Sequence, residues 1–576
     1  MALFTPSESP AVTIKEIDLT GVSPNVQSTT GAFVGNFSWG PIRDPILIST
    51  ENELITTFAA PDSDNTIDFH SAAYFLKYTG SLYVCREATS AAVNSYDSNA
   101  SSAPTIRDRD HFDNQLLTLD SDNHTFIAKY PGELGNAIKV EFCPVDSDDT
   151  IFDAWTYKSE FDSSPGTSTF ASNRSATNDE GHVVVVDKSG KISGTVGTVL
   201  ERFPFVSVGK NAKNTDGSTN YIKDVINNQS NYVWLAGYGA SSNFDALAGT
   251  DIDSGDNFIM PSPAIQTFNM VSGVNSGTLT TSEYATGFDQ FEDVDDIEVD
   301  FLIAPGMSAR ADQTTVVNDL IAIAGTTRKD CVVVTSPART DIINNSGSEA
   351  TAAVTTANTF TNSSYVFVDN AYFKVYDKYN DQYIQIPAAS STAGVMALSD
   401  LATAPWYSPA GSRRGNYIGV TGLTYSPTKA QRDTLYKAGV NPIANIPGEG
   451  LMLYGDKTHL RRPSAFDRIN VRRLFLVLER SIAIAARSVM FEFNDEFTRA
   501  EFVNIVEPVL REVQGRRGIT DYRVVCDASN NTSAVIDRNE FVADIFIKPA
   551  RSINYVTLNF VAVRTGVDFN EVVGTV

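Results

Sequence analysis

The chain has 576 residues and a mass of 62.5 kDa, more than one hydrophobic core usually supports, so three or four domains are expected. Hydrophobic residues make up 42% and charged residues 20%, which excludes a chain that is disordered throughout. The net charge of -25 argues against a protein that coats DNA or an anionic membrane, because binding to phosphate needs clustered Lys and Arg. We therefore expect protein partners, with no direct contact to nucleic acid or membrane.

Charge and cysteine placement add two expectations. Residues 451–576 hold 17 Lys and Arg against 16 Asp and Glu, so the acidity lies in the first 450 residues. The four cysteines lie far apart without a CxxC pair, which favours a reducing cytoplasm over a disulfide framework or a zinc site. The sequence shows neither a secretion signal at its start nor an apolar run long enough to span a bilayer.

The N-terminal third begins with an isolated strand pattern. Residues 10–19 alternate apolar and polar side chains with one slip, which predicts a bulged strand placed before any domain. Short apolar runs punctuated by Gly and Pro then predict strands in residues 31–50, followed by a helix at 71–78 and a buried strand at 81–88. These elements indicate the first part of an α/β unit.

The middle of the chain changes composition twice. Residues from about 90 to 255 are rich in Ser, Asn, Asp, Thr and Gly, with short β-rich runs such as HVVVVD and NYVWLAGY, which predicts an inserted β domain. The α/β pattern resumes with a helix over 314–327 and a buried strand over 331–337. We therefore expect residues 260–435 to complete the unit begun by residues 21–88.

Two helices are predicted in the C-terminal region. Residues 467–490 place Leu474, Leu478, Ile482, Ala485 and Val489 on one face at helical spacing. On the roughly opposite side lie arginines seven residues apart, namely Arg473, Arg480 and Arg487. A second helix, near 497–514, ends at Gly515, with Arg516 and Arg517 beside the negative end of its dipole.

The last strand pattern is unusually long. After two ordinary strands in DYRVVC and FVADIFI, residues 553–563 alternate over 11 positions, about twice the usual strand length. An exposed strand of that length is an aggregation hazard unless its pairing is used, so addition of both terminal strands to neighbouring subunits is one interpretation. An ordinary internal strand remains the alternative for residues 553–563.

No enzymatic constellation is visible, and we expect neither a cofactor nor a metal. The five histidines are scattered and none has the spacing of a metal site or a catalytic base. Residues 450–458 imitate a phosphate-binding loop, but they contain one extra residue, and Asp456 places a carboxylate where a phosphate would bind. Nucleotide binding through Lys457 is therefore a weak alternative.

Several segments together resemble the contractile bacteriophage, or myovirus, tail sheath proteins. The N-terminal ones are PAVTIKEID, AFVGNFSWGPIRDPILIST and LYVCREA, and AKYPGELGNAIKVEF is similar to the segment that enters the protruding part. The C-terminal ones are APWYSPAGSRRG, GVNPIANIPGEGLMLYGDKT, NVRRLFLVLERSI, MFEFNDEFTR, ITDYRVVCDASNNT and FVADIFIKPARSINYVTLNF. The resemblance covers roughly residues 8–90, 126–142 and 290–570, in the order found in that family.

The resemblance implies a multidomain α+β architecture and a set of partners. It implies an α/β sheath core, an inserted β-rich protruding part and a C-terminal α+β domain. The expected parts are an N-terminal arm (1–20), the divided middle domain (21–88 and 260–435), one or two outward-facing insertions (89–259) and a tube-facing C-terminal domain (436–576). The expected partners are other copies of the chain, the tail tube protein, and the baseplate and tail terminator proteins, in a virion tail assembled in the host cytoplasm.

The resemblance also implies roles for particular residues. In that family terminal strands are shared between subunits, which gives as intersubunit strand residues Val12, Ile14, Ile17, Tyr555, Leu558, Phe560 and Val563. The C-terminal domain faces the tube, which gives as candidates for contact with an acidic tube Arg473, Arg480, Arg487, Arg516 and Arg517. For the three arginines of the 467–490 helix, salt bridges within the domain are an equally good interpretation.

Three alternatives remain. A bacteriocin particle or a type VI secretion sheath would use the same mechanism, although secretion sheaths are generally split into two chains. A surface-binding module would use the Ser- and Asn-rich insertion to recognise glycans. An enzyme would need a nucleotide interaction at Lys457.

Overall fold

A computed structural model describes residues 28–97, 100, 102–238, 244–260 and 262–553. The chain divides into two compact units. The larger takes in residues 25–405 and 409–480, and the smaller includes residues 406–408 and 481–576. The predicted terminal strands, 10–19 and 553–563, lie outside the described residues except for Ile553.

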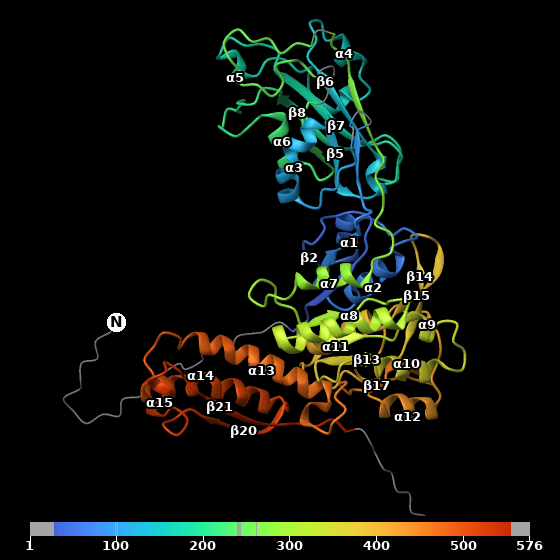
Figure 1. Cartoon of the computed structure of the whole chain (residues 1–576), viewed down its shortest axis with the longest axis vertical. Coiled ribbons are helices and arrows are strands. Elements are labelled where there is room, and N and C mark those ends of the chain that lie inside the picture. The colour runs from blue at the N-terminus through green and yellow to red at the C-terminus, as the bar shows by residue number, and fades with distance from the viewer. Residues whose placement is uncertain (1–27, 98–99, 101, 239–243, 261, 554–576) are drawn as a thin grey trace, which may run out of the picture. The chain divides into compact units, whose positions relative to one another are not determined.

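The larger unit contains a seven-stranded sheet flanked by helices on both faces (Figure 1). Its strands are parallel except for β2, which pairs antiparallel with β3 at one edge. In spatial order they are β17 (Val440–Asn441), β13 (Val366–Asp369), β12 (Val332–Thr335), β11 (Phe301–Ile303), β1 (Gly31–Gly35), β3 (Leu82–Arg86) and β2 (Ile46–Ile48). Segments separated by more than 200 residues thus form one sheet, with β1 paired directly to β11.

The strands of this sheet are apolar on both faces because helices cover both sides. Along β1, Phe33 packs into one core while Ala32 and Val34 pack into the other. The Phe33 face is covered by α2 (Thr66–Leu76), α11 (Ala389–Ala402) and the start of α13 (Ile469–Arg487). The opposite face is covered by α7 (Thr281–Asp289), α8 (Arg310–Ala322), which continues as a π-helix to Arg328, and α10 (Glu349–Ala357).

Smaller elements complete the unit. The helices are α1 (Glu51–Phe58), α9 (Arg339–Ile342) and α12 (Lys429–Lys437). The remaining strands form two small sheets: β14 (Tyr372–Asp377) with β15 (Gln382–Pro387) and β16 (Gly422–Leu423), and β18 (Ile443–Ile446) with β19 (Gly450–Leu453).

A second seven-stranded sheet, antiparallel throughout, lies between β3 and α7 in sequence. Its strands in spatial order are β8 (Thr198–Ser207), β7 (Glu180–Asp187), β6 (Ile138–Pro144), β10 (Gln266–Val271), β4 (Asn94–Asp97), β5 (Phe126–Pro131) and β9 (Val233–Leu235). The helices within this part are α3 (Arg109–Ser121), α4 (Thr150–Ala154), α5 (Thr169–Ser172) and α6 (Ile222–Gln229). The predicted β-rich segments HVVVVD and NYVWLAGY are confirmed as β7 and β9.

The chain enters and leaves this second sheet through paired backbone segments. Val93 and Val274 form an antiparallel bridge, in which each backbone N–H donates to the carbonyl oxygen of the other at 3.1 Å. A few residues outside this bridge, the Thr89 hydroxyl donates to the Ser276 carbonyl oxygen at 2.6 Å. We call these paired segments the neck.

The described part of the smaller unit is built around α14 (Glu496–Gly515). The Asp495 carboxylate caps its N-terminus by accepting from the Thr498 N–H at 2.8 Å, and Phe502, Val506 and Leu510 form its buried stripe. The helix leads into an antiparallel pair, β20 (Ile519–Val525) and β21 (Asp544–Pro549), joined through α15 (Ser533–Ile536). The predicted helix over 497–514 is confirmed within one residue at each end.

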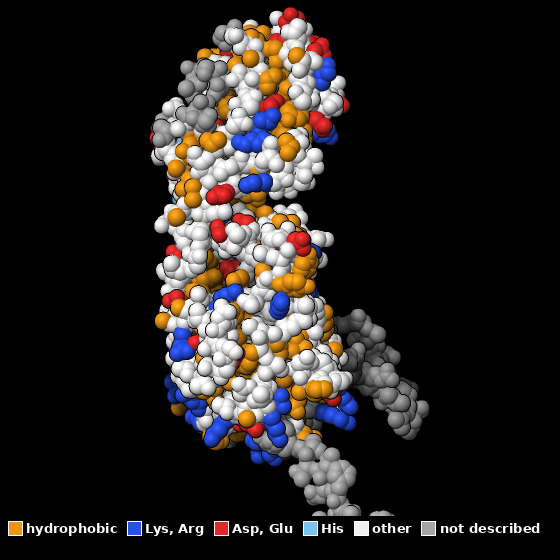
Figure 2. Space-filling model, turned by 90° about the vertical axis from the view of Figure 1, so that its right-hand side faces the viewer, with side chains coloured by type: hydrophobic (Ala, Val, Ile, Leu, Met, Phe, Trp, Pro, Cys, Tyr) orange, Lys and Arg blue, Asp and Glu red, His pale blue; other side chains and the backbone are white. Residues whose placement is uncertain are grey.

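All four cysteines are buried as free thiols. None of the described helices combines the length and the apolar character needed to cross a bilayer. Figure 2 shows Lys and Arg side chains gathering towards the lower end of the view, with fewer of them on the upper part.

Candidate functional site

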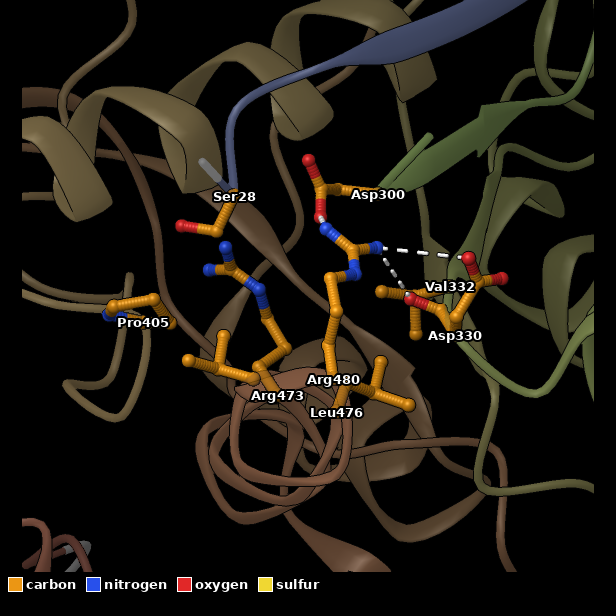
Figure 3. A pocket seen from close by; sticks show the side chains of 9 residues that line it. Ser28, Asp300, Asp330, Val332, Pro405, Arg473, Leu476 and Arg480 are labelled. Atoms are coloured by element: carbon orange, nitrogen blue, oxygen red, sulfur yellow. Dashed lines mark hydrogen bonds and ion pairs between the residues drawn. The ribbon is translucent and has the colours of Figure 1, made fainter. Parts of the chain in front are cut away.

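A buried polar cluster of the larger unit lies where the described chain begins. Figure 3 shows Arg473 and Arg480 rising side by side from α13 toward Asp300 and Ser28, around a small pocket. We call Ser28, Asp300, Asp330, Asp400, Arg473 and Arg480 the root cluster, because residues 1–27 join the described chain at Ser28. The pocket between them is also lined by Val332, Pro405, Leu476 and Val477.

Arg480 is held between two carboxylates. Its Nη1 donates to Asp300 Oδ1 at 2.9 Å, and its Nη2 lies 3.6 Å from Asp330 Oδ2. Nη2 also donates to the Val299 and Asp330 carbonyl oxygens at 3.3 and 3.2 Å. The Arg480 side chain is only 11% exposed, so these contacts replace water around its charge.

Arg473 binds the other buried carboxylate. Its Nη2 donates to Asp400 Oδ2, and its guanidinium lies over the Phe301 ring, 4.9 Å from the ring centroid. The side chains of Arg473 and Asp400 are 4% and 2% exposed. Asp400 Oδ1 has no hydrogen-bond partner among the described residues, which makes this a costly place for a carboxylate.

The first described residues bind the same carboxylates. Ser28 Oγ donates to Asp400 Oδ2 at 3.0 Å, and the Thr30 N–H donates to Asp300 Oδ2 at 3.0 Å. Immediately afterwards β1 begins at Gly31. The two aspartates therefore contact α13 on one side and the start of the described chain on the other.

Asp400 should make stability depend on pH near neutrality. Burial raises the pKa of its carboxyl from 3.8 to about 7, although Arg473 acts against the rise. At pH values between 3.8 and about 7, the Asp400 carboxyl binds more protons in the folded state than in the unfolded state. The stability that it contributes is therefore lost as the pH rises through 7. Lowering the pH from 8 to 6 should therefore raise the unfolding free energy by about 1 kcal/mol through Asp400.

Chemical denaturation of the wild type and of Asp400→Asn at pH 6, 7 and 8 measures this contribution. The variant should show a smaller rise of unfolding free energy on acidification. Two pH profiles of equal slope would contradict the assignment. Asp369, whose pKa burial raises to about 7, stays in both proteins and cancels in the comparison.

The five predicted arginine candidates fall into two groups. Arg473 is buried and Arg480 is only 11% exposed; their ion pairs are with Asp400, Asp300 and Asp330, which lie outside residues 436–576, the domain within which the alternative interpretation placed such pairs. Arg487, Arg516 and Arg517 are exposed in the smaller unit. The Arg516 guanidinium lies over the Trp406 ring at 5.1 Å, while Trp406 Nε1 and Tyr407 Oη both donate to the Arg516 carbonyl oxygen at 3.1 Å.

The segment that imitates a phosphate-binding loop has another role. Residues 450–453 form β19 of a small hairpin, and no helix follows where a phosphate-binding loop requires one. Lys457 Nζ donates to the Tyr436 carbonyl oxygen at 2.8 Å, and Asp456 Oδ1 accepts from Arg468 at 3.0 Å. Among the residues that the structure describes, no group of three or more His, Cys, Asp or Glu side chains is placed to hold a metal ion.

Residues that sequence reasoning missed are Ser28, Asp300, Asp330 and Asp400. Nothing in their local sequence marks them, because each is an isolated acidic or hydroxyl residue among many. The only available signal was the seven-residue spacing of Arg473 and Arg480, which shows that the two side chains share a helix face without showing what covers it.

The chain is similar to phage tail sheath proteins over nearly its whole length. Residues 277–459 match the model of the phage tail sheath protein central domain, and residues 461–562 match that of the phage tail sheath C-terminal domain. The tail sheath protein of Vibrio phage KVP40 is 30% identical, covering 98% of this chain and 99% of its own. That of Salmonella phage ViI is also 30% identical, covering 99% and 98%.

A solved structure shares the fold. The sheath tail protein of Listeria innocua superposes with a TM-score of 0.53 at 11% identity, covering 91% of this chain and 96% of that one. At this identity the likeness extends to the fold alone.

Proposed function

Because the chain belongs to the contractile phage tail sheath family, we propose that it is a structural subunit that polymerises as stacked six-membered rings around a tail tube. The rings form an extended, metastable sleeve on a baseplate, and contraction of the sleeve drives the tube through the host envelope. The observation that carries this proposal is the similarity to tail sheath proteins along nearly the entire chain. The alternative is the sheath of a related bacteriocin or secretion particle.

We assign a role in the sheath to each of the parts expected from the sequence. We assign residues 21–88 and 260–435 to a divided middle domain, residues 89–259 to outward-facing insertion, and residues 436–576 to a tube-facing C-terminal domain. The antiparallel β20–β21 pair supports an assembly role, because a two-stranded sheet is marginally stable alone and has two edges that accept further strands. β21 also carries Phe546, which is 60% exposed.

The occupants of those edges are the terminal strands of neighbouring subunits. Residues 10–19 and 553–563 have the alternation that strand addition requires. Backbone hydrogen bonds would give the contact its strength, and alternate side chains such as Ile14 and Leu558 would set its register. The terminal strands then keep neighbours connected while the subunits rearrange, with no need for nucleotide.

Electron microscopy of negatively stained protein tests assembly. Purified chain at increasing concentration should form hollow, striated tubes of uniform diameter, and addition of tube and baseplate should give sleeves of fixed length. Monomers that persist even with tube and baseplate present would contradict the proposal. Assembly on a phage tube, compared with assembly on a bacteriocin tube, separates the two candidate contexts.

Contact with an acidic tube should depend on the exposed arginines. We expect the double variant Arg516→Glu and Arg517→Glu to fold normally but to need about tenfold more protein to form extended sleeves, because two weak attractions become repulsions. The matched control is Lys191→Glu and Lys213→Glu, which reverses two exposed charges in the segment assigned to the exterior. Equal assembly by both double variants would remove these arginines from the tube contact.

A further inference from the structure

Two buried carboxylates of the root cluster each bind two partners from different parts of the chain. Asp400, near the end of α11, accepts from Ser28 Oγ at 3.0 Å and from Arg473. Asp300, just before β11, accepts from the Thr30 N–H at 3.0 Å and from Arg480 at 2.9 Å. In both cases one partner lies at the start of the described chain and the other lies on α13. The two partners on α13, Arg473 and Arg480, are seven residues apart.

The root cluster joins two segments that continue well beyond it in the sequence. Upstream of Ser28 lie the residues assigned to the intersubunit arm, and α13 continues past Arg480 to Arg487, into residues of the other compact unit. Nineteen residues of unbroken helix transmit displacement well, because an α-helix is held by hydrogen bonds along its whole length. A pull at Ser28 therefore acts on α13 through the hydrogen bond from Ser28 to Asp400 and the ion pair between Asp400 and Arg473.

We propose that Asp400 and Asp300 are positioning residues that fasten the root of the N-terminal arm to α13, so that arm and helix move as one body. This inference rests on the proposed function, since it takes residues 1–20 as the arm that joins neighbouring subunits. A displacement that a neighbouring subunit imposes on the arm would then be passed directly to α13 of the subunit that owns the arm.

A purely stabilising role explains the cluster less well. Apolar side chains of similar volume would fill this space at lower cost, because buried ion pairs repay their desolvation poorly. β1 is already held in the sheet by pairing with β11 and β3, so Ser28 and Thr30 need no carboxylate to start the strand. Asp400 Oδ1, which has no hydrogen-bond partner within the described part of the chain, marks the cost of the arrangement.

Hydrogen exchange on the full-length monomer tests the fastening without any sheath. In Ser28→Ala and in Arg473→Lys, the backbone amides of Thr29, Thr30 and Gly31 should exchange about tenfold faster, as loss of a hydrogen bond to a charged group predicts. The double variant should exchange no faster than the faster single variant, because both changes break one unit. Additive effects, or no change at these amides, would overturn the proposal.

The matched control is Asp341→Asn. Asp341 is a buried carboxylate of the same unit that binds Arg310 and the Thr356 hydroxyl, away from Ser28. This variant should lower the melting temperature while leaving exchange at residues 29–31 unchanged. If it accelerates exchange there as much as Arg473→Lys does, the effect reports general destabilisation and the fastening is refuted.

Sheath assembly supplies the second readout. With tube and baseplate, Ser28→Ala should form extended sleeves that break into separate rings on contraction more often than wild-type sleeves do. Sleeves that contract intact in spite of faster exchange would refute the mechanical role alone. Failure of the wild type to form sleeves would instead refute the proposed function and leave the exchange result standing.

Discussion

An Arg480→Met chain is expected to lose about 3 kcal/mol of unfolding free energy, because it leaves the buried Asp300 without the cation that it contacts, while Asp330 keeps its pair with Arg328 at 2.9 Å. Arg480 is the cation that faces both Asp300 and Asp330, whose side chains are 12% and 14% exposed. It also donates to the Val299 and Asp330 carbonyl oxygens, which methionine leaves unsatisfied. Few single substitutions in this unit should cost more.

Chemical denaturation followed by tryptophan fluorescence measures the loss. Arg511→Met is the control, because Arg511 is 70% exposed and its pair with Glu507 is a surface contact worth at most about 0.5 kcal/mol. Arg480→Lys should fall between them, since it keeps the charge but cannot reach every acceptor. A loss below about 1 kcal/mol in Arg480→Met would mean that water solvates the two aspartates.

A chain that carries Ile14→Pro or Leu558→Pro is expected to fold as a normal monomer and to fail in sheath assembly. Proline removes a backbone donor and fits poorly in a paired strand, so one substitution would interrupt the proposed intersubunit sheet. Because every subunit would contribute the same defective strand, the defect repeats at each junction. The expected result is loss of sleeves by electron microscopy, with melting temperature and circular dichroism unchanged.

Conservative changes in the same strands serve as controls. Val12→Ile with Ile17→Val keeps the alternation, so assembly should persist. Replacing residues 10–19 by a Gly- and Ser-rich segment of equal length keeps the length of the arm but removes its ability to form a strand. This variant therefore shows which of the two properties assembly requires. Normal sleeves in both proline variants would show that the terminal segments are not paired in the sheath.

Much of the secondary structure followed from short-range patterns. Buried parallel strands such as β12 read as continuous apolar runs, which made residues 331–337 recognisable. The C-terminal boundary of α14 followed from the glycine at 515, which acts within one helical turn. Local signals of this kind do not depend on what the rest of the chain does.

The candidate site could not be predicted in the same way. A helical projection places Arg473 and Arg480 away from Leu474 and Leu478, which favours an exposed face. In the structure Phe301 and Asp400 cover Arg473, although they lie 172 and 73 positions away in sequence. Nothing in the periodicity of one helix shows that a second layer covers its polar side, so long-range burial remained invisible.

The neck has a consequence for how this chain can be altered. Val93 and Val274 are already paired, so the two ends of the excursion between them lie one strand spacing, about 4.8 Å, apart. A tight turn would close that gap, provided that another acceptor replaces the Pro131 carbonyl oxygen, to which the buried Arg86 of β3 donates at 2.6 Å. The site is therefore a graft point, at which a foreign domain with adjoining termini could be joined to every copy of the chain.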